Sequence, residues 1–264
     1  MKKMNVIGII TDFGSQDHYV GVMKAVMLEI NKEANIVDIV HEIEPGDLRQ
    51  AAFVLYKTYS YFPRGTVFLA VVDPGVGSER LPVAVKTRNY YFIGPDNGVL
   101  SMAAYADGIL EKRELSRSRY FLKKISRTFH GRDIFAPVAA YVSKGVSLRK
   151  LGPPAASLRK LLLPQVKVSK KEIEAEVLYV DRFGNLVTNL DKRRLLDWTG
   201  KGKFTARIKK KKVSLLSDYY AQRKAGVPFF IEGGFSLLEV SLKNDSAEKY
   251  FNAKVGTKIH IRCA

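Results

Sequence analysis

The hydrophobic pattern of this chain changes after about residue 150, and this change limits the folds open to it. In the first 145 residues, short β-rich runs alternate with helical patterns, which is typical of strand–helix–strand units around a mainly parallel sheet. Beyond residue 168, strand-like runs follow one another closely, separated by Gly, Asp and Asn turns. The segment 151–171 has three prolines and little periodicity. We therefore expect an α/β N-terminal domain over 1–167 and a smaller all-β, barrel-like C-terminal domain over 168–264.

Hydrophobic periodicity also locates the individual elements. The first domain should contain strands at 4–10, 34–40, 66–72, 81–87 and 89–94. Its helices should cover 17–30, 47–61, 99–106 and 132–145. The second domain should contain strands at 172–180, 185–190, 203–209, 212–216, 228–233, 236–242 and 257–262. In the first helix, Val20, Met23, Met27 and Ile30 form one apolar stripe that should face the sheet. Pro137 fits the last helix only in its first turn or at a kink.

Membrane and secretory signals are missing from the sequence. No stretch approaches the roughly 18 uninterrupted apolar residues that a membrane span needs. The apolar run near the N-terminus is interrupted by Asp12 and Gly14, and no small-residue cleavage site follows, which favours a buried first strand. The single Cys263 cannot form an intrachain disulfide. We therefore expect a cytoplasmic protein without a membrane partner.

The charge balance is strongly basic, with 44 Lys and Arg against 26 Asp and Glu and a net charge of +18. Such an excess attracts polyanions, including nucleic acids and anionic membrane surfaces. The lysines are scattered over several expected elements, and no zinc-ligand spacing or aromatic-rich RNA-binding motif accompanies them. Dispersed, solvated charge is therefore the favoured interpretation, and a nucleic-acid partner is not expected.

Acidic residues stand where strands of the first domain end. Asp12 and Asp73 directly follow apolar strands, and Asp17 lies one short turn beyond Asp12. In open α/β sheets the carboxyl ends of parallel strands face the ligand crevice, so Asp12 and Asp73 should point into one site. Carboxylates there often accept hydrogen bonds from ribose hydroxyls. The ordinary alternative for Asp12 and Asp17 is a turn residue and a helix N-cap, but three acids near strand ends favour a binding site.

Two loops of the first domain carry further candidates. The run DPGVGSER begins at Asp73 and ends at Arg80, and its glycines let the backbone approach a ligand closely. It is not a phosphate-binding P-loop, because no Lys-Ser or Lys-Thr pair follows and Pro74 has no amide donor. In TFHGRDIFAP, His130 stands just before a helix start, with Phe129 beside it as a stacking face. A histidine that caps the helix or fixes the loop is the structural alternative.

The second domain offers a polar turn and a glycine pair. DRFGNLVTN places Asp181 and Asn185 around a Phe-Gly turn. Asn presents both a donor and an acceptor, which match the mixed hydrogen-bonding edge of an adenine. Further on, EGGFSLLEVSLKN puts Gly233 and Gly234 before a strand that carries Glu239. Such a glycine pair also fits a plain hairpin bend.

Five of these segments occur in one order along the chain: TDFGSQDHYVGVMKAV, VVDPGVGSER, IGPDNGVL, FHGRDIFAPVAA and DRFGNLVTN. In them, and over nearly its full length, the chain resembles the S-adenosylmethionine hydroxide adenosyltransferase family. This family is related to the fluorinases and chlorinases, which attack the same substrate with halide. The resemblance implies an α/β domain joined to a β-barrel domain. It also implies a homotrimer whose sites lie between the N-terminal domain of one subunit and the C-terminal domain of a neighbour.

The resemblance also implies roles for individual residues. The water-activating trio of the family falls on Asp73, Arg80 and His130. Asp12 matches the ribose-binding acid, with Asp73 also near the sugar, and Asn185 matches an adenine-binding residue. Two further acids match positions that hold the methionine portion in the halogenases, namely Asp17 and Asp181.

The chain departs from the family pattern at one place. Many members carry Ser-Phe-Gly where this chain has Gly234, Phe235 and Ser236, so a side-chain hydroxyl contact is missing or displaced. We therefore expect only a backbone contact from Gly234, with Glu239 and Leu242 following by spacing.

The function implied is hydrolysis of S-adenosyl-L-methionine to adenosine and L-methionine. Water-derived oxygen would attack ribose C5′ in line and expel neutral methionine. The sulfonium leaves readily, so the enzyme must supply orientation, exclusion of bulk water and a reactive nucleophile. Either His130 or Asp73 would accept the proton, while Arg80 holds the nucleophile and the carboxylate. No metal and no cofactor are expected, because no His and Cys ligands cluster in the sequence.

Two other functions are compatible with the sequence. One is a halide-using relative, but halogenases of the family replace the acid and the histidine of the trio, since a carboxylate repels halide and a base has no proton to take from it. This chain keeps all three residues, which favours hydrolysis. The other is a non-catalytic adenosine- or nucleic-acid-binding module, in which the trio is structural. Its RNA binding would weaken steeply with salt.

Overall fold

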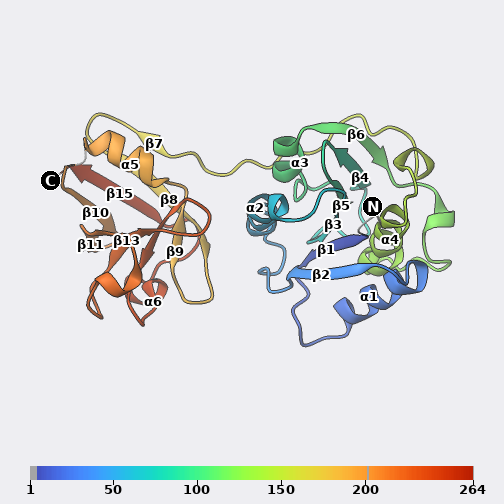
Figure 1. Ribbon diagram of the computed structural model, residues 1–264, viewed down its shortest axis with the longest axis horizontal. Helices are drawn as coiled ribbons and strands as arrows, with labels where there is room; N and C mark the ends of the chain where they lie inside the picture. Colours follow the sequence, from blue (N-terminus) through green and yellow to red (C-terminus); the bar gives the residue numbers. More distant parts are fainter. Residues whose placement is uncertain (1–4, 201, 264) are drawn as a thin grey trace. The chain divides into compact units, whose positions relative to one another are not determined.

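The computed structural model describes residues 5–200 and 202–263, and the chain divides into two compact units, Met1–Leu162 and Leu163–Ala264 (Figure 1). Met4, where the first strand was expected to begin, lies outside the described residues. The predicted boundary between 167 and 168 falls within β7 (Lys167–Val168), which pairs with β8 (Ile173–Val180) of the second unit.

The first unit is built on a six-stranded sheet with the order β2-β1-β3-β5-β4-β6. Its strands are β1 (Val6–Thr11), β2 (Asn35–Val40), β3 (Val67–Val71), β4 (Pro82–Thr87), β5 (Tyr91–Pro95) and β6 (Ile109–Glu114). Strands β2, β1, β3 and β5 run parallel, and β4 is antiparallel to both β5 and β6. The expected mainly parallel sheet is confirmed. Strand β6 was not predicted, because this edge strand, ILEKRE, is largely half-buried and charged and shows no hydrophobic alternation.

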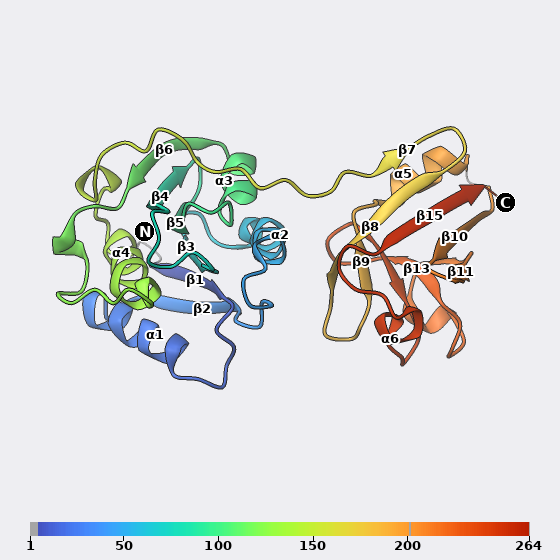
Figure 2. The ribbon, with the colours of Figure 1, turned by 180° about the vertical axis from the view of Figure 1, so that it is seen from behind.

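Helices cover both faces of this sheet, as Figures 1 and 2 show. They are α1 (Tyr19–Ile30), α2 (Leu48–Thr58), α3 (Ser101–Asp107) and α4 (Ala136–Ser143). Helices α1 and α4 pack together on one face, and α2 and α3 pack together on the other. Met23 and Met27 of α1 are fully buried against Ile7 and Ile9 of β1, which confirms the predicted stripe. The longest helix, α1, has 12 residues, and no helix among the described residues is long and apolar enough to cross a membrane.

Short helical turns complete the first unit. They are the 3₁₀ turns η1 (Tyr59–Tyr61), η2 (Ser118–Tyr120) and η4 (Leu148–Lys150), and the π-helical turn η3 (Gly131–Phe135). Helix α2 begins after Asp47, whose side chain accepts a hydrogen bond from the Gln50 amide at 2.9 Å. Pro137 is the second residue of α4, so it lies in a first turn and its missing amide costs no hydrogen bond.

The second unit is a curled, half-barrel sheet of nine strands. The order is β11-β10-β15-β8-β9-β14-β13-β12, with β7 added beside β8, and the pairing is antiparallel except between β12 and β13. The remaining bounds are β9 (Leu186–Thr188), β10 (Phe204–Ile208), β11 (Lys211–Val213), β12 (Leu216–Ser217), β13 (Phe229–Glu232), β14 (Leu238–Ser241) and β15 (Lys258–Cys263). Short helices α5 (Lys192–Thr199), η5 (Tyr220–Gln222) and α6 (Ala247–Phe251) lie between strands. The expected barrel-like domain is confirmed, and its end strands β11 and β12 do not pair in the described part of the chain.

Candidate active site

A pocket of about 390 Å³ lies at the carboxyl ends of β1 and β3. These parallel neighbours are in register through Thr11 and Val71, so Asp12 and Asp73 leave the same edge of the sheet. Both acids line the pocket, together with Phe129 and His130. The structure therefore brings three segments together that are far apart in the sequence.

Asp73, Arg80 and His130 form one hydrogen-bonded array. Arg80 donates from Nε to the Asp73 carboxylate oxygens at 3.1 and 3.0 Å, and from Nη2 to Oδ2 at 2.5 Å. The same Nη2 lies 2.8 Å from Nδ1 of His130. The guanidinium also lies over the Phe135 ring, 5.3 Å from its centroid. Because the side chains of Arg80 and Asp73 are only 9% and 6% exposed, their ion pair is shielded from water and held in one geometry.

The contact with Arg80 determines the protonation of His130. A guanidinium has only donors, so Nδ1 of His130 must accept, and the proton of the neutral ring must then be on Nε2. Burial lowers the pKa of His130 below its ordinary value, and the charge of Arg80 lowers it further, against the opposing effect of Asp73 and Asp133. His130 is therefore neutral near pH 7 and presents an N–H at Nε2.

Local backbone geometry positions this array. His130 immediately precedes the π-helical turn η3, a form that is often found at functional sites because it changes the direction of nearby side chains. On the other side of the array, the DPGVGSER loop is closed by a hydrogen bond from the Val76 amide to the Asp73 carbonyl at 3.1 Å. Gly77 has a φ of 78°, and a Cβ there would lie 2.4 Å from the Arg127 carbonyl oxygen. Only glycine lets this loop lie against the segment that carries His130.

Asp12 and Asp17 have different environments. Asp12 accepts a hydrogen bond from the Gly46 amide at 2.9 Å, and burial raises the pKa of its carboxyl above the ordinary value, against the lowering effect of that bond. Asp17 is exposed and does not line the pocket. It is not a helix cap either, since His18 occupies the N-cap position of α1.

In the second unit, Asp181 and Asn185 form a closed turn. Asp181 accepts from the Phe183 and Asn185 amides at 2.9 and 2.8 Å and from Nδ2 of Asn185 at 2.8 Å. A carboxylate only accepts, so the orientation of the Asn185 amide is determined. One Nδ2 hydrogen and the Oδ1 atom of Asn185 then have no partner among the described residues, which leaves one donor and one acceptor for a ligand.

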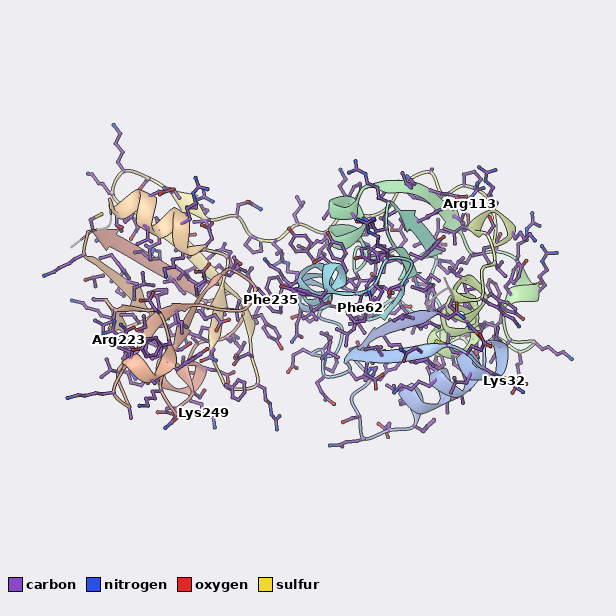
Figure 3. The ribbon with its side chains drawn as sticks, in the orientation of Figure 1. Lys32, Phe62, Arg113, Arg223, Phe235 and Lys249 are labelled. Atoms are coloured by element: carbon purple, nitrogen blue, oxygen red, sulfur yellow. The ribbon has the colours of Figure 1, made fainter. Side chains whose placement is uncertain are left out.

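Asn185 lines a second pocket, of about 530 Å³, within this unit. Leu242 lines it as well, together with Phe183 and Tyr220. Phe183 stands on the turn between β8 and β9 and is 79% exposed, so its ring is free to contact a planar ligand. Figure 3 shows Lys249, another residue of this pocket, on the second unit.

Glu239 and Gly234 do not line either pocket described above. Glu239 on β14 is buried and accepts a hydrogen bond from the Tyr220 hydroxyl at 3.3 Å. Burial raises the pKa of Glu239, and the nearby Asp181 raises it further. A Cβ at Gly233 would lie 1.7 Å from a Glu239 carboxylate oxygen, so glycine is required there. Gly234 is exposed in the β13–β14 hairpin turn, as the hairpin interpretation predicts.

The comparison with protein families covers most of the chain. Residues 7–152 match the SAM hydroxide adenosyltransferase N-terminal domain, and residues 175–260 match the C-terminal domain of the same family. This chain belongs to the SAM hydroxide adenosyltransferase family. The resemblance inferred from the five motifs is therefore confirmed. Among the described residues, no three His, Cys, Asp or Glu side chains are grouped as a metal site requires.

Individual relatives of the chain agree with the family. It is 34% identical to the (R)-S-adenosyl-L-methionine hydrolase of Thermus thermophilus, over 98% of this chain and 100% of the relative. A fluorinase of Actinopolyspora mzabensis is 25% identical, over 72% of this chain and 73% of the relative. The crystal structure of an uncharacterized conserved protein from Thermotoga maritima, 38% identical, matches with a TM-score of 0.91 over 98% of this chain and 100% of that one.

Some residues that line the two pockets were not among the sequence candidates. Gly46 lines the first pocket from the loop after β2, and Phe13 lines it from the residue after Asp12. The loop after β2 was a signal for Gly46, because β2 runs parallel to β1 and so ends at the same edge of the sheet. Phe183 and Tyr220 had no comparable signal, since only the curled sheet brings η5 beside the turn after β8.

Proposed function

We propose that this protein hydrolyses S-adenosyl-L-methionine to adenosine and L-methionine, using water held by Asp73, Arg80 and His130. The activity is that of the family and of the hydrolases it resembles. The observation that carries the proposal for the site is the hydrogen-bonded array at the pocket that also contains Asp12. An acid, a guanidinium and a neutral imidazole together can bind, orient and deprotonate a water molecule.

In this mechanism the three residues have separate tasks. Arg80 holds the Asp73 carboxylate and Nδ1 of His130. His130 has its Nδ1 occupied and its Nε2 protonated, so it donates a hydrogen bond to the attacking oxygen and does not act as the base. Asp73 accepts the proton, because carboxylate oxygens have lone pairs beyond those used by Arg80. The water oxygen forms a bond to C5′, the C5′–S bond breaks, and its electron pair stays on sulfur, which gives neutral methionine.

Substrate recognition is divided between the two pockets in this proposal. Asp12 accepts hydrogen bonds from the ribose, and Phe129 forms an apolar wall of the same pocket. Asn185 reads adenine with its remaining donor and acceptor. Leu242 and Phe183 provide the apolar contact beside it. Asp181 contributes by holding Asn185 in place.

Halide use is the second candidate function, since fluorinases are relatives. A halide in place of water would lie beside the Asp73 carboxylate and would be repelled by it. The chain keeps the acid and the histidine of the trio, and this observation favours water.

The purified protein is expected to convert S-adenosyl-L-methionine to equal amounts of adenosine and methionine without added metal. The Thermus thermophilus relative is named for the (R) form, and we expect the same preference here, by roughly tenfold or more. Inversion at sulfur exchanges the methyl group and the lone pair, so one form places its methyl group against a pocket wall. Chromatography of the products formed from each sulfonium epimer measures both the reaction and the preference. Adding 1 M chloride to a second set of reactions tests the halide alternative. Chlorinated adenosine, methylthioadenosine or S-adenosylhomocysteine as the main product would contradict the proposal.

The protein is expected to form a homotrimer in solution. We also expect it to be located in the cytoplasm. The resemblance supports the trimer, with each site completed by the C-terminal domain of a neighbouring subunit. Light scattering should give three times the 29.6 kDa mass of one chain. A fully active monomer would rule this assembly out. The single, exposed Cys263 is in keeping with a reducing compartment.

A further inference from the structure

The basic charge of the first unit is concentrated in one segment. Residues 112–132 contain eight Lys or Arg and one Glu, whereas the rest of residues 1–162 contains 15 Lys or Arg and 14 Asp or Glu. Composition as a whole favours dispersed charge. The distribution of charge along the first unit indicates a local concentration instead, because nearly all of the positive excess of the unit belongs to a single run of 21 residues.

In the fold this segment, residues 112–132, runs along α4. Near its start, the amides of Ser116 and Arg117 donate to the Leu151 carbonyl, beyond the end of α4, at 3.2 and 3.1 Å. In its middle, Tyr120 packs edge-on against Tyr141 of α4, with ring centroids 5.2 Å apart. The segment thus runs antiparallel to α4, and Figures 1 and 2 show it beside that helix.

The far end of the segment reaches the first pocket, which Thr128 lines. The Leu122 amide donates to the Asp133 carbonyl at 2.9 Å, and the Ser126 amide donates to the Asp133 carboxylate at 2.7 Å. Asp133 is fully buried and is also paired with Arg132, at 2.6 Å. Its charge is therefore used internally and does not neutralise the surface above it.

The strip presents cations without partners. We define the basic strip as six exposed residues, Arg117, Lys123, Lys124, Arg127, Arg149 and Lys150. Arg119 is also exposed, but it lies over the Tyr120 ring, 5.0 Å from the centroid, and is not counted. Among the described residues, only Arg149 has an acidic neighbour, Glu111 at 4.0 Å. Arg113, labelled in Figure 3, is instead neutralised by Glu111 at 2.7 Å and is not part of the strip. The strip cannot help to capture S-adenosylmethionine, whose sulfonium is itself positive, so it calls for a separate, anionic partner.

We propose that the basic strip binds the phosphodiester backbone of nucleic acid. A linear row of cations matches a linear polyanion: the eight residues of α4 span about 12 Å, enough for about three to four phosphates at 3.4 Å each. Hydroxyl groups of Ser116, Ser118, Ser126 and Thr128 lie among the cations, and such groups commonly contact phosphate. Tyr120 and Phe121 are partly buried and pack against the core, so base stacking contributes little and binding is independent of sequence.

An anionic membrane fits the strip less well. Membrane-surface segments insert exposed apolar side chains beside their cations. Within 112–132, Ile125, 44% exposed, is the one large hydrophobic side chain on the surface. The hydroxyls and the scarcity of apolar groups therefore favour nucleic acid.

The test is fluorescence anisotropy of the intact protein with a labelled 20-nucleotide single-stranded RNA. Contact with three to four phosphates of a single strand predicts that affinity falls roughly 20- to 50-fold between 50 and 200 mM salt. The variant Lys123→Glu/Lys124→Glu should bind at least tenfold more weakly and show a smaller salt dependence. The matched control is Lys170→Glu/Lys171→Glu, which makes the same charge change at exposed residues of the second unit and should bind within about threefold of the parent.

Three outcomes would overturn the proposal. They are undetectable RNA binding by the parent at 50 mM salt, equal weakening by both variant pairs, and binding to phosphatidylserine vesicles without binding to RNA. Retained S-adenosylmethionine hydrolysis and an unchanged thermal transition show that each variant is folded. Because RNA binding is measured separately from turnover, the proposal stands or falls independently of the proposed hydrolase mechanism.

Discussion

Asp73→Asn is expected to lower the rate of the chemical step by roughly 10²- to 10⁴-fold, the usual contribution of a general base. The amide keeps the size of the carboxylate but cannot accept the proton of the attacking water. Its NH₂ group would also face the donors of Arg80, which now lie 2.5 to 3.1 Å from the carboxylate oxygens. Single-turnover measurement with saturating S-adenosylmethionine isolates this step from product release.

Glu79→Gln is the matched control for this loss. Glu79 precedes Arg80, is exposed, and has no role in the array, so the same change from acid to amide should leave the rate within about twofold. If Asp73→Asn turned over at the parent rate, Asp73 would not be the base, and the array would be a structural ion pair.

His130→Ala is expected to slow the chemical step by roughly 10²-fold, and His130→Gln to recover most of that loss. Arg80 occupies Nδ1, so the group that His130 offers to the water is the N–H at Nε2. The amide of Gln can place an N–H near the position of Nε2, whereas Ala offers none. Adenosine affinity, measured by calorimetry, should change little in either variant, because the adenine contacts lie elsewhere.

The pair of variants separates a donor from a base. A base would be lost equally in Ala and Gln, since an amide nitrogen does not take up a proton near pH 7. An equal loss of rate in both variants would therefore identify His130 as the base and contradict the assignment of that role to Asp73. If both variants turned over at the parent rate, the role of His130 would be to fix the loop.

Much of the fold could be predicted because its elements have strong local patterns. The stripe of α1, the apolar runs of β1 and β3, and the N-cap at Asp47 are each contained in a few neighbouring residues. Elements without such a pattern were missed. Helix α5 lies between strands where only turns were expected, although Asp191 caps it by accepting from the Arg194 amide at 2.7 Å.

The site could be predicted only in part. Two acids after parallel strands had to share an edge, which is why Asp12 and Asp73 were expected together. Asp17 stands two residues before α1 begins at Tyr19 and could equally have pointed into the pocket, but its side chain is exposed at the surface. Gly234 was expected to provide a backbone contact, and the structure places it in an exposed hairpin turn outside both pockets.

The element types of most of the chain, the two-part organisation and the residues of the trio could be predicted from the amino-acid sequence alone, because they depend on periodicity and on ordered motifs. The hydrogen bonds within the trio could be assigned only from the folded chain. Arg80 and His130 are 50 positions apart, and nothing in the sequence between them indicates that Nη2 donates to Nδ1. This one contact makes His130 a donor. The same holds for the basic strip: its charges are visible in the sequence, but they form a row only because hydrogen bonds to Leu151 and Asp133 hold both ends of the segment along α4.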